Sequence, residues 1–99
     1  MFGTVGRLKG LPGAEPALMA WNQALTSGIN GMIHSVVYRS TDEPDVFWLT
    51  VVFESEEAYR ANAESPEQHR RWSQMRSALA AEIEWHDGQV IAFVPQPQA

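Results

Sequence analysis

The side chains best suited to proton transfer in this 99-residue chain are three histidines, at positions 34, 69 and 86. Imidazole titrates near neutral pH, so it can act as a general acid or base. No two of the three are close in sequence, so they lack the spacing typical of a metal site. The chain has no cysteine, which excludes thiolate nucleophiles and cysteine-based zinc or iron–sulfur sites. We therefore expect no metal site.

Of the three histidines, His69 has the surroundings most suggestive of a function. It lies one helical turn before Trp72, on a helix face with two further apolar residues, so this face should be turned inward. His69 could be a catalytic base in a pocket or a half-buried structural residue. His34 lies in the middle of an expected strand, where it could point into the pocket or lie at the sheet edge. His86 precedes Asp87 and is more typical of a solvated turn.

Aromatic and amide side chains could complete a binding pocket. Four tryptophans are many for a chain of this length, and indole rings suit a flat aromatic ligand. Trp72 is the best pocket candidate, whereas core packing explains Trp21 more simply and a sheet interface explains Trp48. Asn62 could orient a substrate oxygen or cap a broken turn, and Tyr38 could donate its hydroxyl in a pocket or lie at an interface. The candidate residues are thus catalytic His69 and Asn62, and substrate-binding Trp72, Tyr38 and His34.

The elements that must position these residues follow the order strand, helix, strand, strand, helix, strand. After Pro12 and Gly13, apolar residues recur at helical spacing, and Gly28 stands where this helix should end. Apolar runs bounded by turn residues indicate the strands. The expected strands are 3–9, 32–40, 46–53 and 82–94, the last with a tight turn or irregularity at Asp87 and Gly88; the expected helical regions are 14 to about 27 and 55 to about 80.

A break is expected inside the second helical region. Ser55 precedes Glu56 and Glu57, so a capping hydroxyl is followed by acidic residues where the helix dipole favours negative charge. Pro66 is compatible with a first helical turn but not with a helix interior, and Ser65 can cap a new segment. The helix should therefore begin near residue 55 and kink or break at 65–66.

The strand at 46–53 is apolar on both faces, because side chains alternate along a strand. One face carries Phe47, Leu49, Val51 and Phe53, and the other carries Val46, Trp48 and Val52 with Thr50 between them. The chain has enough helix to cover one face of a small sheet, so the other face should pack against a second copy. We predict an α+β, ferredoxin-like βαββαβ fold with an antiparallel sheet, paired into a homodimer through its sheet faces.

Length and composition limit the number of domains and the kinds of partner that the protein can have. The length suits one domain over residues 1–99, with 95–99 as a flexible tail. Seven basic against twelve acidic residues give a net charge of −5, so no nucleic-acid partner is expected. No run approaches the length of a membrane span or signal peptide, which predicts a cytoplasmic protein with no membrane partner. The glycines near the amino terminus do not form a phosphate-binding pattern.

Four short motifs, in this order along the chain, resemble the dimeric α+β barrel superfamily and specifically its antibiotic biosynthesis monooxygenase-like domains. They are PG at 12–13, the strand leading into FESEEAYRA at 53–61, SPE at 65–67 and DG at 87–88. The resemblance spans nearly the whole chain. It implies a homodimer whose two sheets form a barrel, with a pocket between sheet and helices in each subunit.

Some members of this superfamily oxidise polycyclic aromatic compounds with molecular oxygen and no cofactor, and others degrade haem. The functional residues of the haem-degrading members are not matched in this chain. Their asparagine, tryptophan and haem-ligating histidine would fall near Gly6, Asn62 and Trp72. The resemblance therefore implies a cofactor-independent monooxygenase-like protein acting on a small aromatic or quinone-like compound. Its pocket would lower the proton affinity of that compound, so that the carbanion reacts with oxygen. The alternative is a non-enzymatic small-molecule-binding or regulatory dimer on the same fold.

Overall fold

The structure is a computed structural model that describes residues 1–25 and 29–94. Its elements are β1 Phe2–Lys9, α1 Glu15–Leu25, β2 Met32–Arg39, β3 Val46–Phe53, α2 Glu56–Ala63, α3 Pro66–Arg76 and β4 Glu84–Gln89. The predicted helix stop at Gly28 and the predicted tail at 95–99 lie outside the described residues. The second helical region ends at Arg76, earlier than expected.

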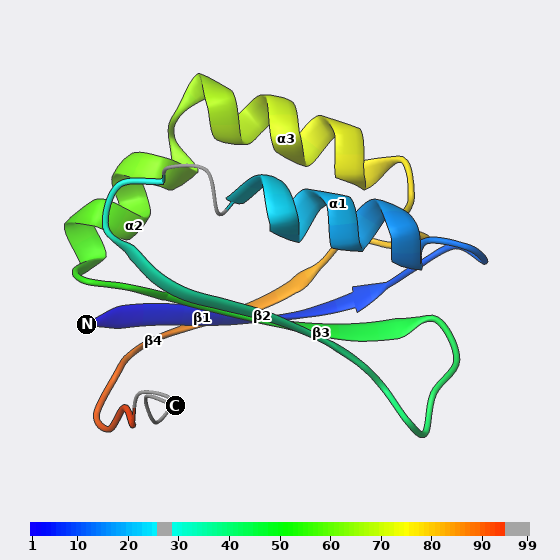
Figure 1. The fold of residues 1–99 in the computed structure, drawn as a ribbon, viewed down its shortest axis with the longest axis horizontal. Coiled ribbons are helices and arrows are strands. Elements are labelled where there is room, and N and C mark those ends of the chain that lie inside the picture. Colours follow the sequence, from blue (N-terminus) through cyan, green and yellow to red (C-terminus); the bar gives the residue numbers. More distant parts are fainter. Residues whose placement is uncertain (26–28, 95–99) are drawn as a thin grey trace.

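The strands form an antiparallel sheet in the order β2-β3-β1-β4. All three helices lie on one side of this sheet, and α1 and α3 run next to each other above it (Figure 1). This arrangement is the predicted ferredoxin-like α+β fold. The two central strands, β1 and β3, are the first strands of the two successive βαβ units, so their pairing joins the two units in one sheet.

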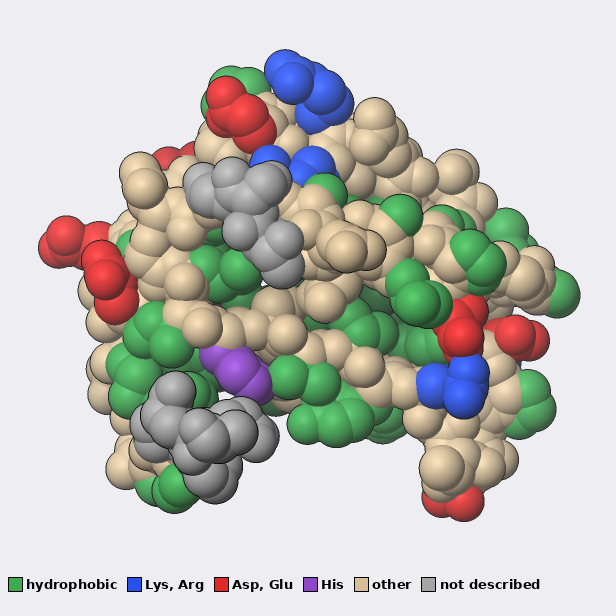
Figure 2. Space-filling view, in the orientation of Figure 1, with side chains coloured by type: hydrophobic (Ala, Val, Ile, Leu, Met, Phe, Trp, Pro, Cys, Tyr) green, Lys and Arg blue, Asp and Glu red, His purple; other side chains and the backbone are tan. Residues whose placement is uncertain are grey.

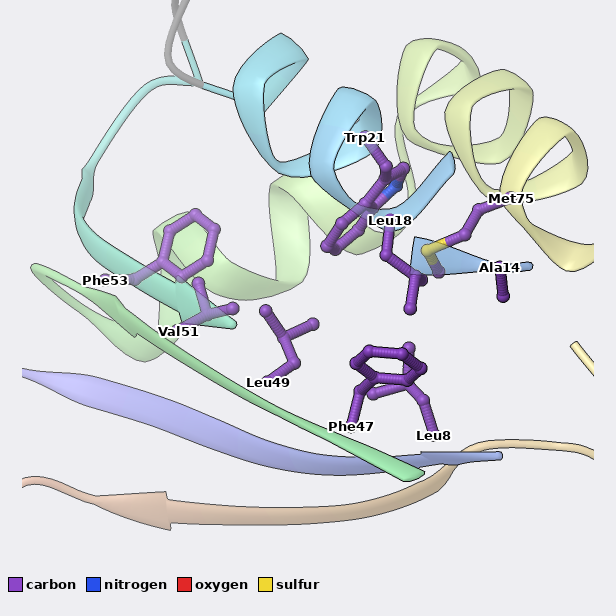
Figure 3. Close-up of a cluster of buried hydrophobic side chains, with 9 residues drawn as sticks. All are labelled: Leu8, Ala14, Leu18, Trp21, Phe47, Leu49, Val51, Phe53 and Met75. Carbon is purple, nitrogen blue, oxygen red and sulfur yellow. The ribbon is translucent and has the colours of Figure 1, made fainter. Parts of the chain in front are cut away.

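The hydrophobic core fills the space between the sheet and the helices. From the sheet, Leu8 and Leu49 point up toward the helices, and from α1, Leu18 and Trp21 point down toward them (Figure 3). Met75 of α3 packs against the same cluster and is almost fully buried. Burying each of these side chains contributes roughly 1.5–3 kcal/mol. The expected helix-facing side of β3 is confirmed: Phe47, Leu49, Val51 and Phe53 all belong to this core.

Two serines define the beginnings of α2 and α3. The Ser55 Oγ accepts a hydrogen bond from the backbone N–H of Ala58 at 3.1 Å, as a helix cap should. The Ser65 Oγ accepts from the N–H of Gln68 at 3.1 Å and donates to the carbonyl of Asn62 at 2.9 Å. The predicted break at 65–66 is therefore present, and Ser65 joins the end of one helix to the start of the next.

The last strand differs from the expectation of a turn or irregularity at 87–88. Asp87 and Gly88 pair in regular antiparallel register with Thr4 and Gly3 of β1. The predicted turn was wrong because β4 pairs with the edge of β1 along its whole length. The backbone hydrogen bonds between these two strands outweigh the turn preference of the Asp-Gly pair. His86 consequently lies within a strand, with an exposed side chain, and not in a turn.

The sheet face away from the helices carries exposed apolar side chains. Val5 of β1, Tyr38 of β2 and Trp48 of β3 are 39%, 54% and 36% exposed. Hydrophobic side chains are visible below the strands, on the side opposite the helices, in Figure 2. As predicted, no described helix covers this face, although Phe93 packs against His34 on it, with ring centroids 5.9 Å apart. We call this surface, centred on Val5, Tyr38 and Trp48, the outer face.

Candidate functional site

A cavity of about 290 Å³ lies between the sheet and the helices. Its lining is mainly apolar and aromatic, with a few polar side chains, as is usual for small-molecule sites. We call it the ligand pocket. It is lined by Thr4, Trp21, Ile29, Met32, Leu49, Val51, Phe53, Tyr59, Asn62, Ala63, Gln68, His69, Trp72 and Trp85.

Two tryptophans from distant parts of the chain form an aromatic wall. Trp72 of α3 and Trp85 of β4 have ring centroids 6.3 Å apart, with their planes tilted by 50°. Gly6 of β1 makes this possible, because a Cβ there would stand only 2.8 Å from the Trp85 ring. The missing side chain at residue 6 is therefore the reason that an indole can lie across the sheet next to the pocket.

The polar groups of the pocket come mostly from the corner between α2 and α3. Asn62 lies in the last turn of α2, and Gln68 and His69 lie in the first turn of α3. The break at Ser65 turns the chain here, so residues six and seven positions apart line one cavity. His69 is exposed although it lines the pocket, so its imidazole is open to solvent and can exchange a proton.

A second polar cluster lies at the other side of the pocket, around Tyr59. The Asp87 carboxylate accepts hydrogen bonds from the hydroxyls of Thr4 at 2.7 Å and of Tyr59 at 3.1 Å. Burial of the Tyr59 ring, followed by the negative charge and hydrogen bond of Asp87, raises the pKa of the Tyr59 hydroxyl above its ordinary value of 10.0. Tyr59 is therefore a neutral hydrogen-bond donor at physiological pH and not a base.

The structure brings three of the five candidate residues together. Asn62, His69 and Trp72 line the ligand pocket. Tyr38 and His34 do not: they pair with Trp48 and Val52 on the outer face. A register shift between Met32 and His34 determines which β2 side chains face the helices. Ser35 is one of them, and its hydroxyl donates a hydrogen bond to the side-chain oxygen of Asn22 on α1 at 2.7 Å. The placement of Tyr38 and His34 in this pocket is corrected accordingly.

Sequence reasoning missed several lining residues, and for one of them a signal was present. Tyr59 precedes Asn62 by three positions, so both lie on the same face of α2 and a pocket at one implies a pocket at the other. Trp85 was among the four tryptophans considered for a cavity wall, and it does line the pocket. No comparable local signal exists for Thr4 or for its hydrogen-bond partner Asp87. Their approach to the helices depends on the pairing of β4 with β1.

Among residues 1–25 and 29–94, no group of three or more histidine, aspartate or glutamate side chains is arranged to hold a metal ion. Within the same ranges, no helix has the length and apolar character needed to cross a membrane.

Solved structures share this fold over nearly their whole length. A proposed antibiotic biosynthesis monooxygenase from Chloroflexus aurantiacus J-10-fl is 26% identical, with a TM-score of 0.81 over 95% of this chain and 96% of its own. SnoaB, a cofactor-independent oxygenase from Streptomyces nogalater solved as the mutant N63A, is 13% identical, with a TM-score of 0.79 over 96% of this chain and 97% of its own. Another proposed antibiotic biosynthesis monooxygenase, from Caulobacter crescentus CB15, is 16% identical, with a TM-score of 0.80 over 92% of this chain and 90% of its own.

Sequence comparison identifies a family as well as a fold. No curated protein matches the chain significantly. The profile of the antibiotic biosynthesis monooxygenase family matches residues 1–74, from β1 into α3, and so includes the Asn62, His69 and Trp72 part of the ligand pocket. Because the match covers about three quarters of the sequence, this chain belongs to the antibiotic biosynthesis monooxygenase family.

Proposed function

We propose that this protein is a cytoplasmic, cofactor-independent monooxygenase that oxidises a small aromatic or quinone-like compound in the ligand pocket. The observation that carries the proposal is the joint presence of His69, Asn62 and Trp72 in one largely aromatic cavity. A proton acceptor, an amide and a stacking surface are what the oxidation of an acidic aromatic compound requires. The likeness to SnoaB, described as a cofactor-independent oxygenase, agrees with this proposal.

The size and walls of the pocket suit a small, flat ligand. At about 290 Å³ the cavity lies at the lower end of the range of roughly 300–1,000 Å³ typical of ligand sites. The tilted indoles of Trp72 and Trp85 offer one ring for stacking and one for an edge contact. A fused-ring phenol or ketone would bury its apolar area here and direct its oxygens toward the α2–α3 corner.

The proposed reaction oxidises a ring methylene group that is conjugated with a carbonyl through an aromatic ring, as in an anthrone. His69 takes one proton from this carbon, and the resulting carbanion is stabilised as an enolate. The carbanion reduces molecular oxygen, and a new C–O bond gives a hydroperoxide after the proton returns from His69 to the oxygen. Loss of water breaks the O–O bond and the second C–H bond. The methylene becomes a carbonyl, with one oxygen atom in the product and one in water.

The same proposal includes a homodimer formed through the outer face. Exposed Tyr38 and Trp48 lie side by side on neighbouring strands; on β1, Arg7 lies opposite Trp48, and exposed Val5 follows two residues away on the same face. Aromatic side chains are enriched in protein interfaces, and an apolar sheet face of this kind is unusual in a monomer. Tyr38 and His34 would then belong to the dimer interface.

Oxygen consumption with 1,8-dihydroxyanthrone as the probe tests the enzymatic proposal, after subtraction of its spontaneous oxidation. The wild type should consume one molecule of oxygen for each quinone formed. His69→Ala should reduce the rate about 100-fold or more, because general base catalysis typically contributes this much. His86→Ala is the matched control for loss of an imidazole: His86 pairs with Val5 on the outer face and does not line the pocket, so its rate should stay within about twofold of the wild-type rate in a variant that keeps the wild-type mass.

Two outcomes would contradict the proposal. An unchanged rate in His69→Ala would exclude His69 as the base. Thermal stabilisation of the wild type by the probe, without oxygen consumption or quinone formation, would instead favour the non-enzymatic binding protein.

A further inference from the structure

Arg71 of α3 donates hydrogen bonds to two amide side chains that line the ligand pocket. Its Nε and Nη2 donate to the Gln68 Oε1 at 3.3 and 3.1 Å, and its Nη2 also donates to the Asn62 Oδ1 at 3.5 Å. Arg71 does not line the ligand pocket; it lines a neighbouring cavity that shares Asn62 with it. The guanidinium therefore contacts the amides and not the ligand space.

This contact determines which end of each amide is available to a ligand. A guanidinium has five N–H donors and no acceptor, so the oxygens of Asn62 and Gln68 must be the atoms that face Arg71. The reverse orientation would place N–H groups against N–H groups. Since both amides also line the ligand pocket, their NH₂ groups are left to hydrogen-bond a ligand there.

No described side chain forms a direct ion pair with Arg71. In residues 1–25 and 29–94, each ion pair involves other side chains. Glu54 and Glu67 line the neighbouring cavity together with Arg71, but neither forms an ion pair with it. A hydrogen bond from a cation polarises an amide, which makes its N–H groups stronger donors.

We propose that Arg71 is a positioning residue that turns Asn62 and Gln68 into a two-donor site for an anionic oxygen. The ligand class is a fused-ring compound that carries an enolate or phenolate oxygen; the identification of this class rests on the proposed function. During oxidation, negative charge moves from the deprotonated carbon onto this oxygen. Two fixed donors at that oxygen would stabilise the anion and make the carbon a stronger acid.

The test compares an anionic probe with its neutral analogue. The probes are 2-hydroxy-1,4-naphthoquinone, whose colour reports its ionisation, and 1,4-naphthoquinone, which lacks the acidic hydroxyl. Binding is followed by quenching of tryptophan fluorescence, because Trp21, Trp72 and Trp85 line the pocket. The wild type should bind the anion about tenfold more tightly than the neutral quinone and should lower the pKa of the bound hydroxyquinone.

Arg71→Met and Arg70→Met form a matched pair, because they remove the same charge at adjacent positions of α3. Arg71→Met should weaken anion binding about tenfold, leave binding of the neutral quinone within about twofold, and raise the pKa of the bound probe. Arg70→Met, at an exposed position outside the pocket, should change neither. Arg71→Lys should restore little of the preference, because an ammonium group lacks the planar fork that reaches both amides.

Asn62→Asp provides an independent variant that keeps the contact with Arg71. A carboxylate can accept from the guanidinium as Asn62 does, so the fold should be retained, but it presents an oxygen to the pocket in place of an NH₂ group. In this variant, the ratio of the affinity for the anion to that for the neutral quinone should fall about tenfold, and 1,4-naphthoquinone should still bind.

Several results would overturn the inference: no binding of the anion by the wild type, no preference for it, an unchanged preference in Arg71→Met, or full recovery in Arg71→Lys. These measurements do not depend on turnover. If the anion preference follows Arg71 but no oxygen is consumed, the proposed oxygenase activity fails and the anion site stands. If oxygen is consumed and the preference does not follow Arg71, the anion site fails alone.

Discussion

At the residue scale, the hydroxyl of Tyr59 links the helices to the far edge of the sheet. It donates to the Asp87 carboxylate of β4, which also accepts from Thr4 of β1. The ring of Tyr59 packs against Phe2 and Phe53, with centroids 5.1 and 5.6 Å away. One side chain thus combines apolar packing with a charge-assisted hydrogen bond, and both hold α2 over the pocket.

Burial of Tyr59, followed by the charge and the hydrogen bond of Asp87, should make the stability of the protein sensitive to alkaline pH. The pKa of Tyr59 is higher in the folded than in the unfolded state, so the folded state retains a proton that the unfolded state loses above about pH 10. The contribution of Tyr59 is therefore fully present below pH 10 and is lost as the pH rises through the folded pKa.

Tyr59→Phe should reduce the free energy of unfolding by about 1 kcal/mol at neutral pH, because it removes one hydrogen bond but keeps the ring. It should also flatten the decline in stability above pH 10. Urea unfolding at pH 7 and at several values above pH 10 measures both effects. Tyr38→Phe is the control, since Tyr38 lies on the outer face. An equally steep alkaline decline in Tyr59→Phe and in the wild type would show that this hydroxyl is not responsible.

At the element scale, the corner between α2 and α3 determines how the polar part of the pocket is built. Ser65 donates to Asn62 at the end of α2 and accepts from Gln68 at the start of α3, so it bonds to the backbone of two pocket residues. Pro66 occupies the first position of α3, where its missing N–H costs nothing. The break between α2 and α3 therefore positions the polar residues of the pocket.

Ser65→Ala and Ser55→Ala separate capping from pocket assembly. Each removes a helix cap, and each should reduce the free energy of unfolding by about 1 kcal/mol. Only Ser65→Ala should weaken binding of 2-hydroxy-1,4-naphthoquinone, because Ser55 caps α2 at its far end, away from Asn62 and Gln68. Thermal unfolding and fluorescence titration of both variants measure the two effects. Equal loss of binding in both would mean that the corner has no special role.

At the scale of the whole molecule, the helices cover one face of the sheet and leave the other exposed (Figure 1). The exposed apolar residues of the outer face lie on the three strands β1, β2 and β3. Such a surface is costly in water and is removed when two sheets pack against each other. The ligand pocket lies on the opposite side of each sheet, so every subunit would keep its own site.

Thr50→Glu should convert the proposed dimer into a folded monomer, because Thr50 lies between Val5 and Val36 on the outer face, where a charge buried in the interface would have no opposite charge beside it. Sedimentation equilibrium should give a mass of about twice 11.1 kDa for the wild type and about 11.1 kDa for the variant. Met19→Glu is the control: Met19 is 62% exposed on α1, in the helix layer, and its variant should remain dimeric. A wild type that sediments as a monomer would contradict the proposed interface.

The sequence by itself determined those features that depend on near neighbours. Alternation along 46–53 identified the helix-facing side of β3, although Val46, expected on the other face, is also buried. Ser55, Ser65 and Pro66 identified the start of α2 and the break before α3. It also placed His69 and Trp72 on one helix face, and both line the pocket. These features are local, because they depend on side-chain periodicity and on hydrogen bonds within a few residues.

Only the tertiary structure decided which distant residues meet. Thr4 and Asp87 are 83 positions apart, and only the pairing of β1 with β4 brings them together. The register shift in β2 turned His34 away from the pocket, which no local pattern in MIHSVVYR indicates. Asn62 and Arg71 are nine positions apart on different helices, and the corner at Ser65 places the amide beside the guanidinium. Such contacts follow from strand order, register and helix placement, which the packing of the whole chain determines.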